Sequence, residues 1–127
     1  MIAAYNTYVK SYMKTLAIPY PPSVNTYWGF KGHRRFLTPK ANQFKSAVAQ
    51  IVSDQQIKFG NQRLEISITL YPPDRRIRDI DNVIKSTLDA LVSADAFEDD
   101  SLIDVLLIQR GELVKGGKAL VTIKVLD

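Results

Sequence analysis

Residues 63–71, RLEISITLY, alternate polar and apolar side chains and are rich in β-branched residues, and Pro72 and Pro73 follow them directly. Successive side chains of an extended chain point to opposite faces, so this segment predicts a strand with one face in a core. Proline cannot donate a ladder hydrogen bond, so the strand is expected to end there. The fold must therefore contain a sheet that is covered on one side.

Two helices are expected to supply that cover. Thr38 and Pro39 form a helix start signal, a capping hydroxyl followed by proline at the first helical position. Apolar residues recur after them at helical spacing, and Gly60 is expected to close this helix. The apolar face of the second helix comprises Ile80, Ile84, Thr87, Leu88 and Leu91.

Three further strands are expected, at residues 14–20, 103–110 and 118–126. VKGGK, between the last two, predicts a tight turn because paired glycines tolerate positive φ. Residues 21–37 are expected to form a loop. The order β-α-β-α-β-β predicts an α/β (α+β) fold with a mixed, partly antiparallel sheet and two main helices. A chain of 127 residues fits one domain, here residues 14–127 after an N-terminal extension, residues 1–13.

The composition excludes several chemistries. The chain has no cysteine, which excludes disulfides, thiolate nucleophiles and cysteine-ligated zinc. One histidine, His33, cannot form a His-rich metal site. No apolar stretch is long enough to span a bilayer, and residues 1–16 carry tyrosines and lysines where a signal peptide needs unbroken apolar residues. The expected location is therefore the cytoplasm.

Charge is distributed unevenly along the chain. Its net charge is +4, yet nine of the thirteen acidic residues lie between Asp74 and Asp104. An overall positive charge indicates, weakly, a polyanionic partner. The acidic block is flanked on both sides by basic residues, which are Lys31, Arg34, Arg35, Arg110, Lys115 and Lys118.

The acidic block contains a candidate metal site. If residues 77–81 are extended, Asp79 and Asp81 point to the same side, and two converging carboxylates need a cation between them. Oxygen ligands of this kind suit Mg²⁺ or Mn²⁺. Lys85 lies one helical turn after Asp81, where its ammonium could reach an anion at the metal. Glu98, Asp99 and Asp100 follow the helix, so the chain must double back to bring them to the site.

Arg75, Arg76 and Arg78 come immediately before these carboxylates. Metal-dependent phosphodiester hydrolysis needs carboxylates to hold the metal and positive charge to hold the phosphate. A run that mixes acids and bases within seven residues has that composition. The segment therefore favours hydrolysis of a nucleic acid.

Structural explanations of the same residues stay open at this point. Asp81, Lys85 and Asp89 are spaced like a solvent-facing ladder of ion pairs, and Asp79 could simply cap the helix. Glu98–Asp100 could be a solvated turn, and the arginine run a solvated surface. Four aromatic residues could either stack on bases or fill the core, namely Tyr20, Tyr27, Trp28 and Phe30.

Four segments together resemble the RusA family of Holliday junction resolvases: PPSVNTYW at 21–28, PPDRRIRDIDNVIKSTLDAL at 72–91, FEDDSLID at 97–104 and the terminal VKGGKALVTI. The resemblance covers roughly residues 15–126, in the same order. It implies a small homodimeric, Mg²⁺-dependent endonuclease that resolves four-way DNA junctions by symmetric nicks. A closed two-fold dimer would supply the two matched sites that two nicks need.

The resemblance also implies roles for single residues. Asp79 and Asp81 match the family's D-x-D metal ligands, and Asp100 matches the acidic residue of the later D-D pair. Lys85 matches the family's essential lysine. The DNA-contacting residues are expected to be Arg75, Arg76 and Arg78, together with Lys31, Arg34 and Arg35.

Three other functions remain as alternatives. One is a metal nuclease without selectivity for junctions, and another is a catalytically silent protein that binds branched DNA. The third is an interaction domain with no role on nucleic acid. Substrate choice at equal salt, the effect of Asp81→Asn on cleavage, and DNA binding at low salt discriminate between them.

Overall fold

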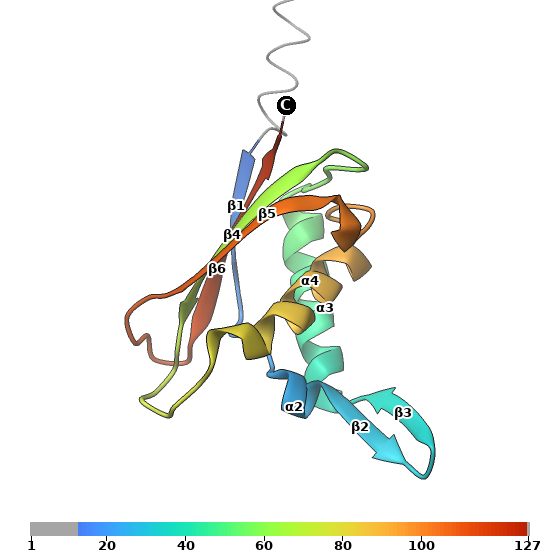
Figure 1. Cartoon of the computed structure of the whole chain (residues 1–127), viewed down its shortest axis with the longest axis vertical. Coiled ribbons are helices and arrows are strands. Elements are labelled where there is room, and N and C mark those ends of the chain that lie inside the picture. Colours follow the sequence, from blue (N-terminus) through green and yellow to red (C-terminus); the bar gives the residue numbers. More distant parts are fainter. Residues whose placement is uncertain (1–12, 127) are drawn as a thin grey trace, which may run out of the picture.

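A computed structural model describes residues 13–126, so the expected N-terminal extension lies almost entirely outside the described residues. Its centre is a four-stranded sheet with the strand order β1-β6-β4-β5. The two main helices, α3 and α4, lie together on one face of this sheet (Figure 1). The strands of the sheet are β1 (Met13–Ile18), β4 (Leu64–Tyr71), β5 (Ile103–Arg110) and β6 (Lys118–Val125).

The pairing confirms the predicted mixed sheet. β6 pairs antiparallel with both β1 and β4, whereas β5 runs parallel to β4. Buried and half-buried residues alternate strictly along β4 and β6, which is the pattern of a sheet with one covered face. The covered face contributes the core residues Leu64, Ile66, Ile68, Leu70, Ala119, Val121, Ile123 and Val125.

The first main helix, α3 (Pro39–Asp54), begins where predicted. The Oγ1 of Thr38 accepts a hydrogen bond from the backbone N of Ala41 at 3.2 Å, and Pro39 occupies the first turn. The predicted end at Gly60 is wrong, because the helix stops at Asp54 and Gln56 adopts a positive φ of 53°. The residues between carry buried Ile57 and Phe59, which pack into the core.

The second main helix, α4 (Ile84–Ser93), lies on the crossover between the parallel strands β4 and β5. A short 3-10 turn precedes it, η1 (Ile80–Val83), and another follows, η2 (Asp100–Leu102). Leu88, Ala90 and Leu91 bury its inner face against the core. No helix between residues 13 and 126 has both the length and the apolar character needed to cross a bilayer.

The prediction of a loop at residues 21–37 is wrong. This region holds a short helix, α2 (Val24–Tyr27), and an antiparallel hairpin of β2 (Trp28–Lys31) and β3 (Arg34–Leu37). The hairpin turns through Gly32 and His33, with Gly32 at a φ of +63°, which is typical of a two-residue turn that begins with glycine. Strands of four residues are too short to show a period-two pattern.

The VKGGK segment forms the predicted tight turn. The backbone N of Gly117 donates to the oxygen of Val114 at 2.7 Å, and Gly116 and Gly117 both have positive φ. The strands that it connects are not neighbours, however, because β4 lies between β5 and β6. The outer edge of β5 therefore carries no partner strand within the described residues.

Candidate functional site

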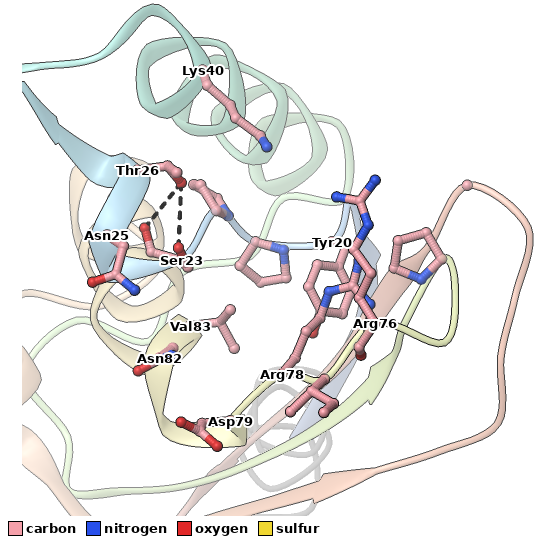
Figure 2. A pocket seen from close by; sticks show the side chains of 15 residues that line it. Tyr20, Ser23, Asn25, Thr26, Lys40, Arg76, Arg78, Asp79, Asn82 and Val83 are labelled. Atoms are coloured by element: carbon pink, nitrogen blue, oxygen red, sulfur yellow. Dashed lines mark hydrogen bonds between the residues drawn. The ribbon is translucent and has the colours of Figure 1, made fainter.

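A polar groove of about 500 Å³ lies where three distant parts of the chain meet. Figure 2 shows Arg76, Arg78 and Tyr20 along one side of it, and Asn25 and Thr26 along the other. Lys40 reaches toward it from the first turn of α3. The groove is lined by Tyr20, Pro21, Pro22, Ser23, Asn25, Thr26, Lys40, Pro73, Arg76, Ile77, Arg78, Asp79, Asn82, Val83 and Gly116.

The arginine loop, residues 72–78, is held together by Asp74. The carboxylate of Asp74 lies 2.8 Å from Nη1 of Arg78 and 3.7 Å from Nε of Arg76. It also accepts a hydrogen bond from the backbone N of Arg76 at 3.0 Å. The hydrogen bond from Arg78, followed by that backbone bond, lowers the pKa of Asp74 to about 2.

Arg78 is fixed from several sides. Its guanidinium lies 5.7 Å from the centre of the Tyr20 ring, and it donates to the backbone oxygen of Asp74 at 3.1 Å. The guanidinium of Arg110, at the end of β5, donates to the backbone oxygen of Arg78. Arg75 and Arg76 instead extend into solvent, and Ile77 is fully exposed between Arg76 and Arg78. The loop thus presents positive charge outward from a fixed base.

Asp79 opens η1 and lines the groove. Its backbone is extended, with φ −87° and ψ 134°, and occupies the capping position, but its side chain makes no capping hydrogen bond. Asp79 is thus at the N-cap position, as the structural explanation expected, but its carboxylate does not cap the turn. Its exposed carboxylate forms no ion pair within residues 13–126.

Asp81 does not lie on an extended segment with Asp79. The chain enters a 3-10 turn at Ile80, closed by a hydrogen bond from the backbone N of Asn82 to the oxygen of Asp79 at 3.2 Å. The premise that a period of two places both side chains on one side is therefore wrong. Asp81 is exposed and, like Asp79, has no cationic partner among the described residues.

The acidic cluster after α4 doubles back along that helix, which is the condition for these acids to approach the site. Asp99 and Asp100 share a second hollow of about 220 Å³ with Lys85 and Asp89 of α4. Asp99 accepts a hydrogen bond from the backbone N of Ser101 at 3.0 Å. Its pKa is lowered by hydrogen bonding to the Ser101 side chain, then by this backbone bond, and least by the positive charge of Lys85. Asp100 is exposed at the start of η2.

Lys85 and Asp89 form an ion pair, with Nζ 3.0 Å from Oδ1. The expected alternative of a ladder from Asp81 through Lys85 to Asp89 is only half present, because no ion pair joins Asp81 to Lys85. Asp89 also accepts a hydrogen bond from the hydroxyl of buried Tyr27 at 3.3 Å. Burial and the nearby carboxylate raise the pKa of Tyr27 to about 12. Asp89 thus holds Lys85 toward the second hollow.

The three carboxylates expected to bind metal do not form one compact cluster. Between residues 13 and 126, no group of three or more His, Asp or Glu side chains has the spacing of a metal site. Asp79 lines the groove, whereas Asp100 lies in the second hollow. All three carboxylates are nevertheless exposed and unpaired among the described residues, so their oxygens fit the donor set of a Mg²⁺ ion. A shared site for Asp79, Asp81 and Asp100 stays a prediction.

The other basic residues predicted to bind DNA lie apart from the groove, on the β2–β3 hairpin. Lys31 and Arg34 face each other across the hairpin next to its turn, and all of Lys31, Arg34 and Arg35 are exposed. The guanidinium of Arg35 lies 3.9 Å from the centre of the Trp28 ring. Lys40 and Asn25 could not be predicted as groove residues, and Tyr20 was considered only for stacking or the core, because only the fold brings these residues beside Asp79.

Comparison with known proteins identifies the family. The family model described as Endodeoxyribonuclease RusA matches residues 19–125. This chain belongs to the RusA family. The matched region includes the groove, the second hollow and the hairpin.

Several curated relatives carry the RusA name. The crossover junction endodeoxyribonuclease rusA of Enterobacteria phage HK97 is 38% identical over 102 residues, which is 80% of this chain and 85% of its own. Crossover junction endodeoxyribonuclease RusA of Escherichia coli strain K12 is 30% identical over 110 residues, 86% of this chain and 92% of its own. The rusA protein of Enterobacteria phage 82 is also 30% identical, over 109 residues.

Proposed function

We propose that this protein is a Mg²⁺-dependent endodeoxyribonuclease that resolves four-way DNA junctions by symmetric paired nicks in DNA recombination and repair. One observation carries the proposal. In this member of the RusA family, Asp79 and Asp81 directly follow a fixed arginine loop, and neither carboxylate forms an ion pair among the described residues. The proposal keeps the cytoplasmic location that was expected from the sequence.

In this proposal the acidic residues bind the metal, and the basic residues bind the DNA. Asp79, Asp81 and Asp100 would hold Mg²⁺, with Mn²⁺ as a substitute, and the bound metal would supply an activated water and neutralise charge on the phosphate. Lys85, oriented by Asp89, orients the attacking water or stabilises charge at the scissile phosphate. The arginine loop binds the DNA backbone beside Asp79 through Arg75, Arg76 and Arg78.

Cleavage of a labelled four-way junction beside a matched linear duplex tests this function. Each substrate is incubated with Mg²⁺ or with EDTA, and with the natural protein, Asp81→Asn, or Asp95→Asn as a matched control. Asp95 is also exposed but is already paired with Lys58, so this change is expected to leave the nicks in place. Symmetric Mg²⁺-dependent nicks on the junction, lost in Asp81→Asn, are the expected result.

Other outcomes identify the alternative functions. Equal cutting of both substrates would indicate a nuclease without junction selectivity. Tight junction binding with no cutting in Mg²⁺ or Mn²⁺ would indicate a silent binding protein. No DNA binding even at low salt would favour an interaction domain.

A homodimer is the second part of this proposal, and the edge strand β5 supports it. Val105, Leu106 and Leu107 are exposed on this strand, Leu107 at 55%. An exposed apolar edge strand is a template for pairing with another chain. Asp104 lies near its start and Arg110 at its end, so a second copy that pairs antiparallel about Leu107 brings opposite charges together twice.

The mass in solution tests the dimer and its surface separately. The natural protein is expected at twice 14.3 kDa, and Leu107→Lys at 14.3 kDa, in light scattering after size exclusion. Leu113→Lys is the matched control, since Leu113 is 45% exposed but lies outside the sheet, and this variant should stay dimeric. A monomeric natural protein would overturn the dimer, whereas a dimeric Leu107→Lys would overturn only the role of β5.

A further inference from the structure

The β2–β3 hairpin carries an aromatic side chain that packs against little of the protein. Phe30 is 71% exposed, the highest exposure of any aromatic residue between residues 13 and 126. It lies one residue before the end of β2, close to the Gly32-His33 turn. Figure 1 shows this hairpin projecting from the body, away from the four-stranded sheet. Exposing a phenyl ring at this position costs favourable burial, so packing does not explain it.

The base of the hairpin is firmly anchored. Tyr27, which precedes β2, is buried and contacts the Trp28 ring edge to face, with centroids 5.2 Å apart. The backbone N of Thr38, after β3, donates to the oxygen of Tyr27 at 3.1 Å, and the Thr38 hydroxyl donates to the oxygen of Thr26 at 2.7 Å. The tip therefore stands on a fixed support.

The two strands also pack tightly on each other. Phe36 lies opposite Gly29, and a Cβ at position 29 would approach the Phe36 ring to 2.5 Å. Only glycine lets that ring lie flat across the hairpin. On the opposite face Arg35 is directly across from Phe30 and stacks on Trp28. Phe30 is thus presented to solvent by a rigid hairpin, beside a cation.

The surroundings of Phe30 favour nucleic acid as its partner. Arg35 lies across from it on the same face of the hairpin, Lys31 and Arg34 lie next to it on the other face, and no acidic residue lies between residues 13 and 53. Cations bind phosphates, and an aromatic ring stacks on any base whose face is exposed. A continuous duplex offers no such face because every base pair is stacked on its neighbours. A branch point, where the stack is interrupted, does offer one.

We propose that Phe30 is a specificity determinant that stacks on a base exposed at the branch point, while Lys31, Arg34 and Arg35 bind the neighbouring phosphates. This inference rests on the proposed junction activity. The hairpin thereby distinguishes branched DNA from continuous duplex, whereas the groove around Asp79 binds the strand to be cut.

Binding at fixed salt to a four-way junction and to a linear duplex of the same sequence tests this role. Mg²⁺ is replaced by EDTA so that no DNA is cut. Phe30→Ala is expected to weaken junction binding about tenfold to a hundredfold and to leave duplex binding unchanged. Phe30→Tyr, which keeps an aromatic face, should retain junction affinity. Leu113→Ala removes another exposed apolar side chain and is expected to change neither substrate.

A second measurement reports stacking directly. 2-Aminopurine placed at the branch point should change its fluorescence when the natural protein or Phe30→Tyr binds, and not when Phe30→Ala binds. An equal loss on both substrates, or no loss on either, would overturn the role of Phe30. A natural protein that binds junction and duplex equally would also overturn the discrimination by the hairpin. The proposed junction activity fails separately, if the cleavage assay shows no nicks that are specific to the junction. Thermal unfolding of each variant verifies that the fold is intact.

Discussion

Two aspartates, one within the arginine loop and one directly after it, have opposite surroundings. Asp74 binds Arg78 at 2.8 Å and Arg76 at 3.7 Å, and its pKa is lowered to about 2. Asp79 lines the groove and has neither a capping hydrogen bond nor an ion pair among the described residues. The Asp74 carboxylate is neutralised by the arginines that it holds in place. The Asp79 carboxylate keeps its charge available for a ligand.

Both residues are aspartates, so residue type cannot tell a structural acid from a candidate catalytic one. The presence or absence of an ion pair can. A carboxylate already neutralised by guanidinium groups has little affinity left for a metal ion. The same distinction divides Asp89 and Asp104, which are both paired, from Asp81 and Asp100, which form no ion pair within residues 13–126. The candidate metal ligands are therefore identified by whether a cation lies beside each carboxylate, and not by the presence of an aspartate alone.

Neutralising each aspartate in turn tests most directly whether Asp74 and Asp79 have different roles. Asp79→Asn is expected to lower the rate of junction cleavage about a hundredfold or more, because a ligand for the metal is lost. Asp74→Asn is expected to lower it less than tenfold, since Arg78 stays near Tyr20. Single-turnover nicking rates in Mg²⁺ measure both. Equal losses would mean that the two carboxylates do not have distinct roles.

The arginine loop offers a second contrast, between the exposed Arg75 and Arg78, which is fixed by Asp74. Arg75→Gln is expected to weaken binding to junction and duplex alike and to reduce the salt slope of log K by about 0.7–0.9, the share of one phosphate contact. Arg78→Gln should show the same reduction and also a lower Tm, because Arg78 bonds within the loop. Affinities measured between about 50 and 200 mM salt, with thermal melts, separate these effects. An unchanged slope for Arg75→Gln would exclude a phosphate contact there.

Acid unfolding gives the smallest expected effect. The folded-state pKa of Asp74, about 2, lies below its ordinary value of 3.8, so the charged carboxylate stabilises the fold above about pH 4. That contribution is lost as the pH falls from about 4 to 2. Asp74→Asn should therefore melt a few degrees lower than the natural protein at pH 6, and the difference should shrink toward pH 2. A difference that does not depend on pH would mean that the ion pair does not stabilise the fold.

Long periodic segments and caps were predictable from sequence. The alternation along β4 and β6 needed only local pattern, and Thr38 with Pro39 marked the start of α3. The β2–β3 hairpin was missed because each strand is four residues long and the glycine turn was the only local signal. The position of β4 between β5 and β6 depends on pairing across the whole sheet, which no local pattern encodes.

The candidate site was predictable in composition but not in geometry. Asp79, Asp81, Lys85 and Asp100 could be proposed from a motif, yet the 3-10 turn at Ile80 overturns the extended geometry assumed for the first two. Lys85 has an aspartate four residues away on each side, and the sequence treats them alike. In the folded protein Lys85 pairs with Asp89, whose carboxylate also accepts a hydrogen bond from the buried Tyr27 hydroxyl.

The strand order has a consequence for how this protein is made. β6, the last strand in the chain, lies inside the sheet and bonds to β1 on one side and β4 on the other. Until residues 118–125 have been synthesised, β1 and β4 lack their common neighbour, and the crossover that carries the carboxylates can rest only on the β4–β5 pair. The complete sheet beneath the candidate site therefore forms last, after the final strand has left the ribosome.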